Sequence, residues 1–375
     1  MKIAKIKGIE IRLHLSTLVI VALIGFYAAS FYISIVPTSS FIELFFVGFI
    51  SGVIILISIL IHELSHSILA QREGLIVSEI DLYFFGGVSK IEEEPKSPKS
   101  EIIITAVGPL SSLLIGIIFL VLYYSPLSMS TMISVILFYS GITNIGLGFF
   151  NLLPAFPIDG GRLLRAFLWK HRDNFISATK SASRIGVGFS YGLMAYGIFQ
   201  MLSFGLVSGL WLILMGFFLR SSAKQSYFQT LNEYTLSHIS VKEMLNIPKK
   251  DLEIPFNMTV SDAIREYFIP YQKSYFPVIQ GEEVVGVVHI SDIKKVSLNE
   301  RSRYIVGYIM RNISEIPDIE QNRTGKEVMK QLRQSNNPPK ILIVREKDNN
   351  EIIGFIGEDE LVSSLKYWNL NTQHA

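Results

Sequence analysis

Long apolar stretches alternate with short polar segments through the first 220 residues of the chain. These stretches cover residues 14–36, 41–69, 102–125, 131–153 and 185–219. A helix needs about 20 apolar residues to cross a bilayer, so each of the first four stretches predicts one membrane span. The fifth stretch is too long for one span, and the segment Gln200–Gly205 predicts a turn between two short helices. We therefore expect six spans.

The composition supports a membrane domain followed by a soluble domain. Of the 375 residues, 49% are hydrophobic and 18% are charged, and the mean hydropathy is +0.39. Soluble domains carry about 25% charged residues. The net charge of +2 is too close to neutral to favour nucleic acid as a partner. The chain has no cysteine, so histidines and carboxylates are the available metal ligands.

Basic residues are unevenly distributed among the segments that connect the predicted spans. Lys and Arg are absent from the three segments expected outside, which are 37–40, 124–130 and 200–205. Because cytoplasmic loops are enriched in Lys and Arg, we expect a multi-pass protein of the cell (inner or plasma) membrane with both termini in the cytosol. The first apolar stretch exceeds the core of about 7–15 residues of a cleaved signal, so we expect it to remain as a span.

The second predicted span ends in ionisable residues, in the order His62-Glu63-Leu64-Ser65-His66. Ionisable side chains are costly at membrane depth and are seldom without a function there. On a helix, His62 and His66 lie one turn apart on the same face, so both can bind one tetrahedral Zn²⁺. Glu63 lies beside them and can take a proton from water held by the metal. The alternative is an ordinary amphipathic helix end at the membrane interface.

A second polar segment, Phe149–Phe167, interrupts the apolar pattern. It contains Asn151, Pro154, Pro157, Asp159 and two glycines. Proline and glycine break regular helix, and irregular backbone at membrane depth is tolerated only inside protein or beside a water-filled cavity. Asp159 is therefore a candidate third metal ligand. Alternatively, it is the N-cap of a basic amphipathic helix over 162–172, which we expect to lie on the anionic inner leaflet.

Together the two polar segments resemble the site-2 protease family of intramembrane zinc metalloproteases. They match its two motifs as His62-Glu63-x-x-His66 and Asn151-x-x-Pro154-x-x-Pro157-x-Asp159-Gly160. The resemblance extends over about residues 8–220. Segments 83–90 and 105–112 also resemble the family's Phe-Gly-Gly segment and its Ala-Gly-Pro turn.

The resemblance implies an activity and a role for each motif residue. One Zn²⁺ per chain would be bound by His62, His66 and Asp159. Glu63 would be the general acid and base, and Asn151 would hold the substrate backbone or the developing oxyanion. The implied substrate is a membrane protein whose transmembrane helix is cut in or near the lipid bilayer, as in regulated intramembrane proteolysis.

A helical substrate must unwind before its backbone can be cut, because its amides are hydrogen-bonded within the helix. The segment 78–94 has strand-like character around Gly86 and Gly87. We expect it to offer an edge on which an unwound substrate pairs as a strand, which makes both glycines candidate substrate-binding residues. The alternative is a structural hairpin on the membrane surface.

Residues 238–365 contain an internal repeat. Each copy follows the order β-α-β-β-α over about sixty residues and resembles a CBS domain, two of which pair into a regulatory module. The expected fold is a polytopic α-helical membrane domain with six spans, followed by a soluble α/β tandem CBS module. Its parts are a membrane domain, a helical linker and two CBS repeats, over 1–222, 223–239, 240–297 and 303–368.

CBS modules often bind adenine nucleotides, with an aspartate meeting the ribose. The first copy keeps this residue as Asp292, with His289 in place of a hydroxyl residue, whereas the second copy has Glu360. The resemblance thus implies an adenine nucleotide at Asp292. The alternative is a module without ligand that forms a homodimer or docks the substrate.

A rival function from another class is a channel or transporter gated by the CBS module, with the ionisable residues lining an ion path. Against it, the predicted spans contain no paired repeats, and their polar residues cluster near one face of the membrane. We therefore expect a zinc protease.

Overall fold

The computed structural model describes residues 2–83, 86–91, 93–126, 130–205, 209–245, 252–334, 340–346 and 351–372. The chain divides into two compact units, Met1–Phe228 and Gln229–Ala375. The division falls inside one long helix, within the segment predicted as a helical linker.

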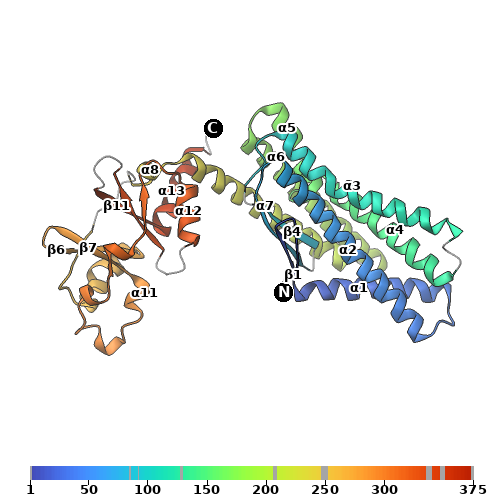
Figure 1. Ribbon diagram of the computed structural model, residues 1–375, viewed down its shortest axis with the longest axis horizontal. Helices are drawn as coiled ribbons and strands as arrows, with labels where there is room; N and C mark the ends of the chain where they lie inside the picture. The colour runs from blue at the N-terminus through green and yellow to red at the C-terminus, as the bar shows by residue number, and fades with distance from the viewer. Residues whose placement is uncertain are drawn as a thin grey trace. The chain divides into compact units, whose positions relative to one another are not determined.

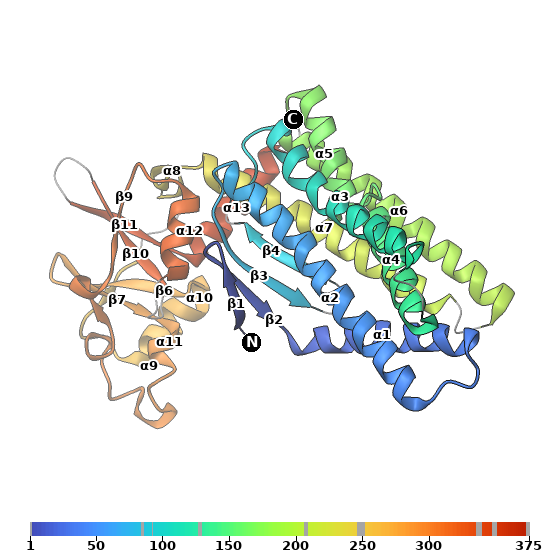
Figure 2. The same cartoon turned by 45° about the vertical axis from the view of Figure 1, so that its right-hand side comes forward.

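Long helices form most of the first unit (Figure 1). They are α1 (Leu15–Ile35), α2 (Phe41–Arg72), α3 (Pro98–Tyr123), α4 (Thr131–Asn151), α5 (Asp159–Arg172), α6 (Phe175–Phe204) and α7 (Leu210–His238), the last of which continues into the second unit. Helices α2, α3 and α4 pack side by side, and α5 packs against α3 and α6 (Figure 2). Five of the described helices, α1 to α4 and α6, are long and apolar enough to cross a membrane.

Helices α1 to α4 coincide with the first four predicted spans. The turn predicted at 200–205 lies too early, because α6 continues through Phe204. Helix α6 ends at Gly205, whose φ of +100° is a backbone conformation that favours glycine. The turn predicted for 105–112 is wrong, since this segment is helical within α3 and contains Pro109. A long membrane helix tolerates such a proline where neighbouring helices support the freed backbone.

A four-stranded sheet lies beside α2 (Figure 2). Its order is β1 (Lys2–Ile6), β2 (Ile9–Leu13), β3 (Val77–Tyr83) and β4 (Gly86–Ile91). Strands β3 and β4 pair antiparallel, in agreement with the strand-like character predicted around Gly86 and Gly87. Phe84 and Phe85 of the Phe-Gly-Gly segment lie outside the described residues. Strand β2 runs parallel to β3 and buries Ile9 and Ile11. The sequence reasoning did not predict strands in the first 13 residues.

The second unit contains two sheets built alike. The first is β5 (Ile254–Pro255), β6 (Tyr275–Gln280), β7 (Glu283–His289) and β8 (Arg311–Asn312), and the second is β9 (Asp318–Glu320), β10 (Ile341–Arg345) and β11 (Ile352–Gly357). In each sheet a short strand runs parallel to the next strand, which then pairs antiparallel in a hairpin. This repetition agrees with the internal repeat predicted from the sequence.

The helices of this unit are short except for α12 and α13. They are α8 (Val241–Leu245), α9 (Val260–Ala263), α10 (Ile269–Tyr271), α11 (Ile290–Ile293), α12 (Gly325–Gln334) and α13 (Glu358–Thr372), with a π-helical turn at Ile264–Phe268 and 3₁₀ turns at Leu298–Glu300, Val306–Tyr308 and Ile313–Glu315. Leu236 of α7 and Met244 of α8 are buried in one core with Val328 and Leu342 of the second repeat. The end of α7 is therefore part of this unit's core.

Candidate metal centre

Two histidines of α2 and the first residue of α5 meet inside the first unit. The Nε2 atoms of His62 and His66 lie 3.2 and 3.1 Å from Oδ2 of Asp159 and 3.2 Å from each other. The ligand atoms of these three residues are all within 4.8 Å of one another, and both histidines are buried. Atoms bound to one tetrahedral Zn²⁺ are separated by roughly 3.3 Å, given metal–ligand distances of about 2.0–2.1 Å. The three side chains thus fit one face of a zinc tetrahedron.

The outer nitrogens of the two imidazoles are held by α3. His66 Nδ1 lies 2.7 Å from the carbonyl oxygen of Ile104, and His62 Nδ1 lies 2.9 Å from Oγ of Ser112. Because a carbonyl only accepts, Nδ1 of His66 donates, which leaves the lone pair of its Nε2 directed at the centre. Such contacts fix the ring orientation and tautomer of metal-binding histidines.

Gly108 of α3 is packed directly against the two imidazoles. A Cβ atom on Gly108 would lie 2.0 Å from Nε2 of His66 and 2.8 Å from Nε2 of His62. The sequence reasoning assigned no role to Gly108 or Ser112. Their spacing puts both residues on one face of a helix, since residues four apart lie one turn apart, but it does not say which helix packs against that face.

Asp159 is presented by an irregular segment between α4 and α5. Helix α4 ends at Asn151, residues 152–158 form turns with a cis bond between Phe156 and Pro157, and α5 begins at Asp159. The N-cap of α5 is Ile158, so the alternative of Asp159 as N-cap is wrong. The carboxylate of Asp159 faces the two histidines instead of capping α5.

Glycines allow the first turn of α5 to touch this irregular segment. A Cβ atom on Gly160 would lie 2.2 Å from the carbonyl oxygen of Leu152. A Cβ atom on Gly161 would lie 2.2 Å from the backbone nitrogen of Phe156. A side chain at either position would push α5, and Asp159 with it, away from the histidines.

A buried ion pair joins α5 to α3. The guanidinium of Arg165, 2% exposed, pairs with fully buried Glu101 and lies 3.0 Å from the carboxylate of Glu94. It also lies 5.2 Å from the ring centre of Phe156 and 4.8 Å from that of Phe175. Burial lowers the pKa of Arg165, but Glu101 and Glu94 outweigh it and hold the pKa above its ordinary value. The expectation that the 162–172 helix lies on the lipid headgroups is therefore wrong at Arg165, which faces protein.

A cavity of about 320 Å³ opens beside the three candidate ligands. Its walls bring together residues that the sequence singled out from three separate segments: His62, Glu63, Gly86, Gly87, Asn151 and Asp159. His66 does not line the cavity. The side-chain nitrogen of Asn151 donates to the carbonyl oxygen of Leu147, at 3.0 Å. Phe218 and Leu219 of α7 form part of the apolar wall.

Tyr83 of β3 also lines this cavity and is anchored by Asp81. The Tyr83 hydroxyl donates to Oδ2 of Asp81 at 3.0 Å, and Nζ of Lys90 lies 3.1 Å from the same oxygen. Burial raises the pKa of Asp81, but the hydrogen bonds from Lys90 and Tyr83 outweigh it and hold the pKa below its ordinary value. Burial and the Asp81 carboxylate raise the pKa of Tyr83, so its hydroxyl remains a donor near neutral pH.

In the second unit, the two carboxylates considered for nucleotide binding have protein partners. Asp292 is buried and accepts a hydrogen bond from Nζ of Lys295 at 2.8 Å. Glu360 accepts from the hydroxyl of Tyr275 at 2.6 Å and from the backbone nitrogen of Gly357 at 2.9 Å. Glu360 is thus engaged in contacts within the unit.

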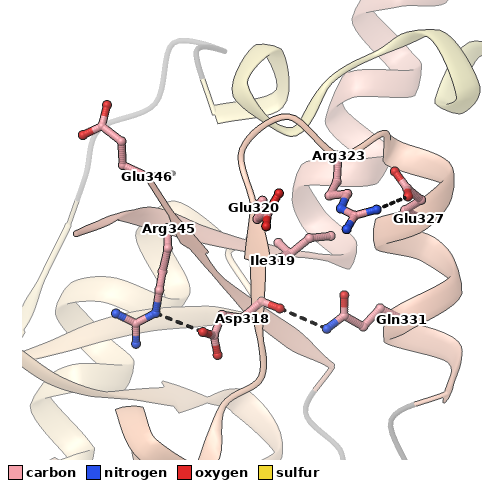
Figure 3. A pocket seen from close by; sticks show the side chains of 8 residues that line it. All are labelled: Asp318, Ile319, Glu320, Arg323, Glu327, Gln331, Arg345 and Glu346. Atoms are coloured by element: carbon pink, nitrogen blue, oxygen red, sulfur yellow. Dashed lines mark hydrogen bonds and ion pairs between the residues drawn. The ribbon is translucent and has the colours of Figure 1, made fainter. Parts of the chain in front are cut away.

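A cleft of about 470 Å³ lies in the second repeat, between β9, the end of β10 and α12 (Figure 3). Its arginines are paired, with Arg345 3.1 Å from Asp318 and Arg323 2.9 Å from Glu327. Gln331 donates to the backbone oxygen of Asp318 at 3.1 Å. Neither Asp292 nor Glu360 lines this cleft.

Comparison with known proteins identifies two families. The sequence model of Peptidase family M50 matches residues 50–130 and 125–195, which include both motifs, and that of the CBS domain matches residues 241–299. The chain is 29% identical over 318 residues to Rip3 of Mycobacterium tuberculosis, which carries the provisional name of a zinc metalloprotease, with 84% of this chain and 80% of Rip3 covered.

The similarity extends over the full length of an archaeal protein. The chain is 28% identical over 377 residues to a zinc metalloprotease of Methanocaldococcus jannaschii. The match covers 99% of this chain and 98% of that protein. The solved structure of the site-2 protease from the same organism is 30% identical, with 60% of this chain and 94% of that chain covered and a TM-score of 0.42. By these sequence matches the chain belongs to the site-2 protease family, peptidase family M50, and is a zinc metalloprotease of the membrane that carries a CBS domain.

Proposed function

We propose that this protease cuts peptide bonds in or near a transmembrane helix of a membrane-protein substrate, with zinc bound by His62, His66 and Asp159. The observation that carries the proposal is the meeting of three ligand atoms at mutual distances of 3.1–3.2 Å, beside a cavity in the helical unit. Three protein ligands leave a fourth position on a catalytic zinc open.

Bound zinc supplies a Lewis acid that polarises the scissile carbonyl and lowers the pKa of water. Glu63 acts as the base: its carboxylate accepts a proton from the attacking water as the carbon–oxygen bond forms. It then returns the proton to the amide nitrogen as the carbon–nitrogen bond breaks. Asn151 lines the same cavity, and its side-chain nitrogen carries a second hydrogen, beyond the one given to Leu147, for the substrate carbonyl.

The substrate pairs as a strand with β4. Among the described strands, β4 ends its sheet and pairs only with β3, which leaves its other backbone edge without a strand partner. Gly86 and Gly87 of this strand line the cavity. A photo-cross-linking residue in place of Val88, which is 52% exposed, should capture a single-span substrate in a Glu63→Gln background. Absence of this cross-link, with capture from sites elsewhere on the unit, would favour the purely structural hairpin.

Helix α7 is a sixth membrane-crossing helix, and both termini lie in the cytosol. Contacts between α6 and α7 support this topology: Gly197 lies against Gly209, Gly216 against Met194, and the hydroxyl of Ser183 donates to the carbonyl oxygen of Ala223. Helix α7 thus packs antiparallel to α6, which is a candidate span.

The absence of cysteine makes this topology directly measurable. Thr38→Cys, at an exposed position between α1 and α2, should react with an impermeant maleimide in intact cells, whereas Ser297→Cys, which is also exposed, should react only after permeabilisation. Labelling of Ser297→Cys from outside would support five spans.

The CBS pair modulates the protease from the cytosol, with Asp292 contacting the ribose of an adenine nucleotide. Its burial and its place in the single turn of α11 support this role. ATP or AMP should raise the thermal midpoint of the full chain, and Asp292→Ala should remove the shift. A shift that survives Asp292→Ala would place the nucleotide elsewhere. No shift in the wild type, together with a dimer in detergent, would favour a CBS pair that forms a homodimer.

The decisive experiment is the metal content of the detergent-purified protein. We expect about one zinc per chain in the wild type and in Glu63→Gln, and loss or strong weakening of zinc in His66→Ala and Asp159→Asn. Cleavage of single-span substrates should fall by about 10²- to 10⁴-fold in Glu63→Gln, because only the proton transfer is lost. Full zinc content in Asp159→Asn would contradict the proposed ligand set.

A further inference from the structure

Glu63 receives a hydrogen bond from the strand on which the substrate is proposed to pair. The hydroxyl of Ser89, in β4, donates to Oε2 of Glu63 at 2.9 Å. The hydroxyl of Ser67, one turn of α2 beyond Glu63, donates to Oγ of Ser89 at 3.0 Å. Ser67 is fully buried. The two serines thus form a short chain of donors that ends on the carboxylate of Glu63.

The backbone of β4 also packs against the Glu63 side chain. Gly87 and Ser89 are two residues apart and therefore point to the same face of the strand. A Cβ atom on Gly87 would lie 2.2 Å from Cγ and 2.8 Å from Cδ of Glu63. Contact with Gly87 and the hydrogen bond from Ser89 together restrict the rotamers of a side chain that is otherwise flexible.

The direction of these hydrogen bonds suits a base. The oxygen of the Ser89 hydroxyl accepts the hydrogen bond from Ser67, so its single proton remains for the hydrogen bond to Glu63. Within the described residues, one hydrogen bond reaches this carboxylate, and it goes to Oε2. Oε1 is therefore left to accept a proton from water.

We infer that Ser89 is a positioning residue, which holds the Glu63 carboxylate in place and couples its orientation to the pairing of substrate on β4. This inference rests on the proposed function. A substrate strand that pairs with β4 fixes the backbone that carries Ser89, and with it the hydroxyl that orients the base. Ser89 does not touch the substrate through its hydroxyl, so its loss affects turnover more than binding.

The test measures kcat and KM of the full-length protein in proteoliposomes with a single-span substrate, together with zinc content. Ser89→Ala should lower kcat by about 10- to 100-fold, the range expected for one hydrogen bond to a charged group, with KM within about twofold and zinc unchanged. Ser89→Thr keeps the hydroxyl and should recover most of kcat. Ser67→Ala should lower kcat less than Ser89→Ala, because it removes only the second donor.

Ser78→Ala is the matched control. Ser78 lies on β3 of the same sheet, is exposed, and donates to the backbone oxygen of Lys90 without contacting Glu63. Its kcat should equal that of the wild type.

Three results would overturn the inference: unchanged kcat in Ser89→Ala, loss of kcat that Ser89→Thr does not recover, or loss of zinc along with kcat. If Ser89→Ala does not fold, unchanged kcat in Ser67→Ala overturns it. Failure of the proposed function looks different, since the wild type would then be inactive or Glu63→Gln would remain active.

Discussion

In the candidate metal centre the ligand atoms of His62, His66 and Asp159 lie within 4.8 Å of one another, whereas in the cleft of the second repeat each arginine lies against its own carboxylate. Both places are concave and rich in ionisable residues, and Figure 3 shows those of the cleft. In the cleft, Arg345 pairs with Asp318 and Arg323 pairs with Glu327, so these opposite charges satisfy one another.

The difference separates a binding arrangement from a structural one. Imidazole nitrogens and a carboxylate that point at one another inside a protein stabilise the fold little by themselves. Their arrangement becomes favourable when a cation binds between them. Opposite charges that pair at an exposed place need no ligand and contribute about 0–1 kcal/mol. The family membership of the chain agrees with the first arrangement as the site of chemistry.

The largest expected effect that tests this comparison is on zinc binding. Gly108→Ala places a methyl group 2.0 Å from Nε2 of His66, so at least one imidazole must turn away. We expect zinc affinity to fall by about 10- to 100-fold or more, as for other changes in the support of metal ligands, measured by competition with a chelator.

Gly146→Ala is the control for Gly108→Ala. Gly146 lies on α4 with nothing within 4 Å of a built Cβ atom, so zinc affinity should not change. Equal zinc affinity in Gly108→Ala and the wild type would show that the imidazoles do not hold the metal in the described arrangement.

A smaller effect is expected from breaking the buried ion pair that joins α5 to α3. Arg165→Met leaves buried Glu101 with only the longer contact to Arg162, at 3.9 Å, which should lower the free energy of unfolding by about 3–5 kcal/mol, measured by denaturation in mixed micelles. A second change, Glu101→Leu, should recover most of this loss because the poorly paired buried charge is removed. Lys170→Met, an exposed change on the same helix, should have little effect. A loss equal to that of Lys170→Met would show that the pair does not fix α5.

The smallest effect is expected in the second unit. Arg323 precedes α12 and Glu327 lies in its first turn; their side chains are 52% and 45% exposed. Arg323→Gln should lower the free energy of unfolding by only about 0.3–0.5 kcal/mol, and the difference should vanish at high salt. A loss comparable to that of Arg165→Met would contradict the distinction between buried and exposed pairs.

The sequence alone predicted the helices and strands that have a regular pattern of apolar and polar residues. Apolar length located α1 to α4, because the bilayer thickness sets how many residues a helix needs. Helical periodicity placed His62 and His66 on one face, since residues four apart lie one turn apart. Strand alternation and the internal repeat located the two similar sheets of the second unit. The proline- and glycine-rich break made Asp159 a candidate ligand, and the motif resemblance then favoured this role over that of an N-cap.

Only the tertiary structure decided which residues support this site. Ser112 reaches His62 across 50 residues of chain, Asp159 across 97, and Ser89 reaches Glu63 across 26. Gly108 and Arg165 gain their roles from helices that pack beside them, and β2 becomes a strand by pairing with β3. Such contacts cannot be predicted from sequence periodicity. A periodic pattern tells on which side of its helix or strand a residue lies, but not which distant element packs against that side.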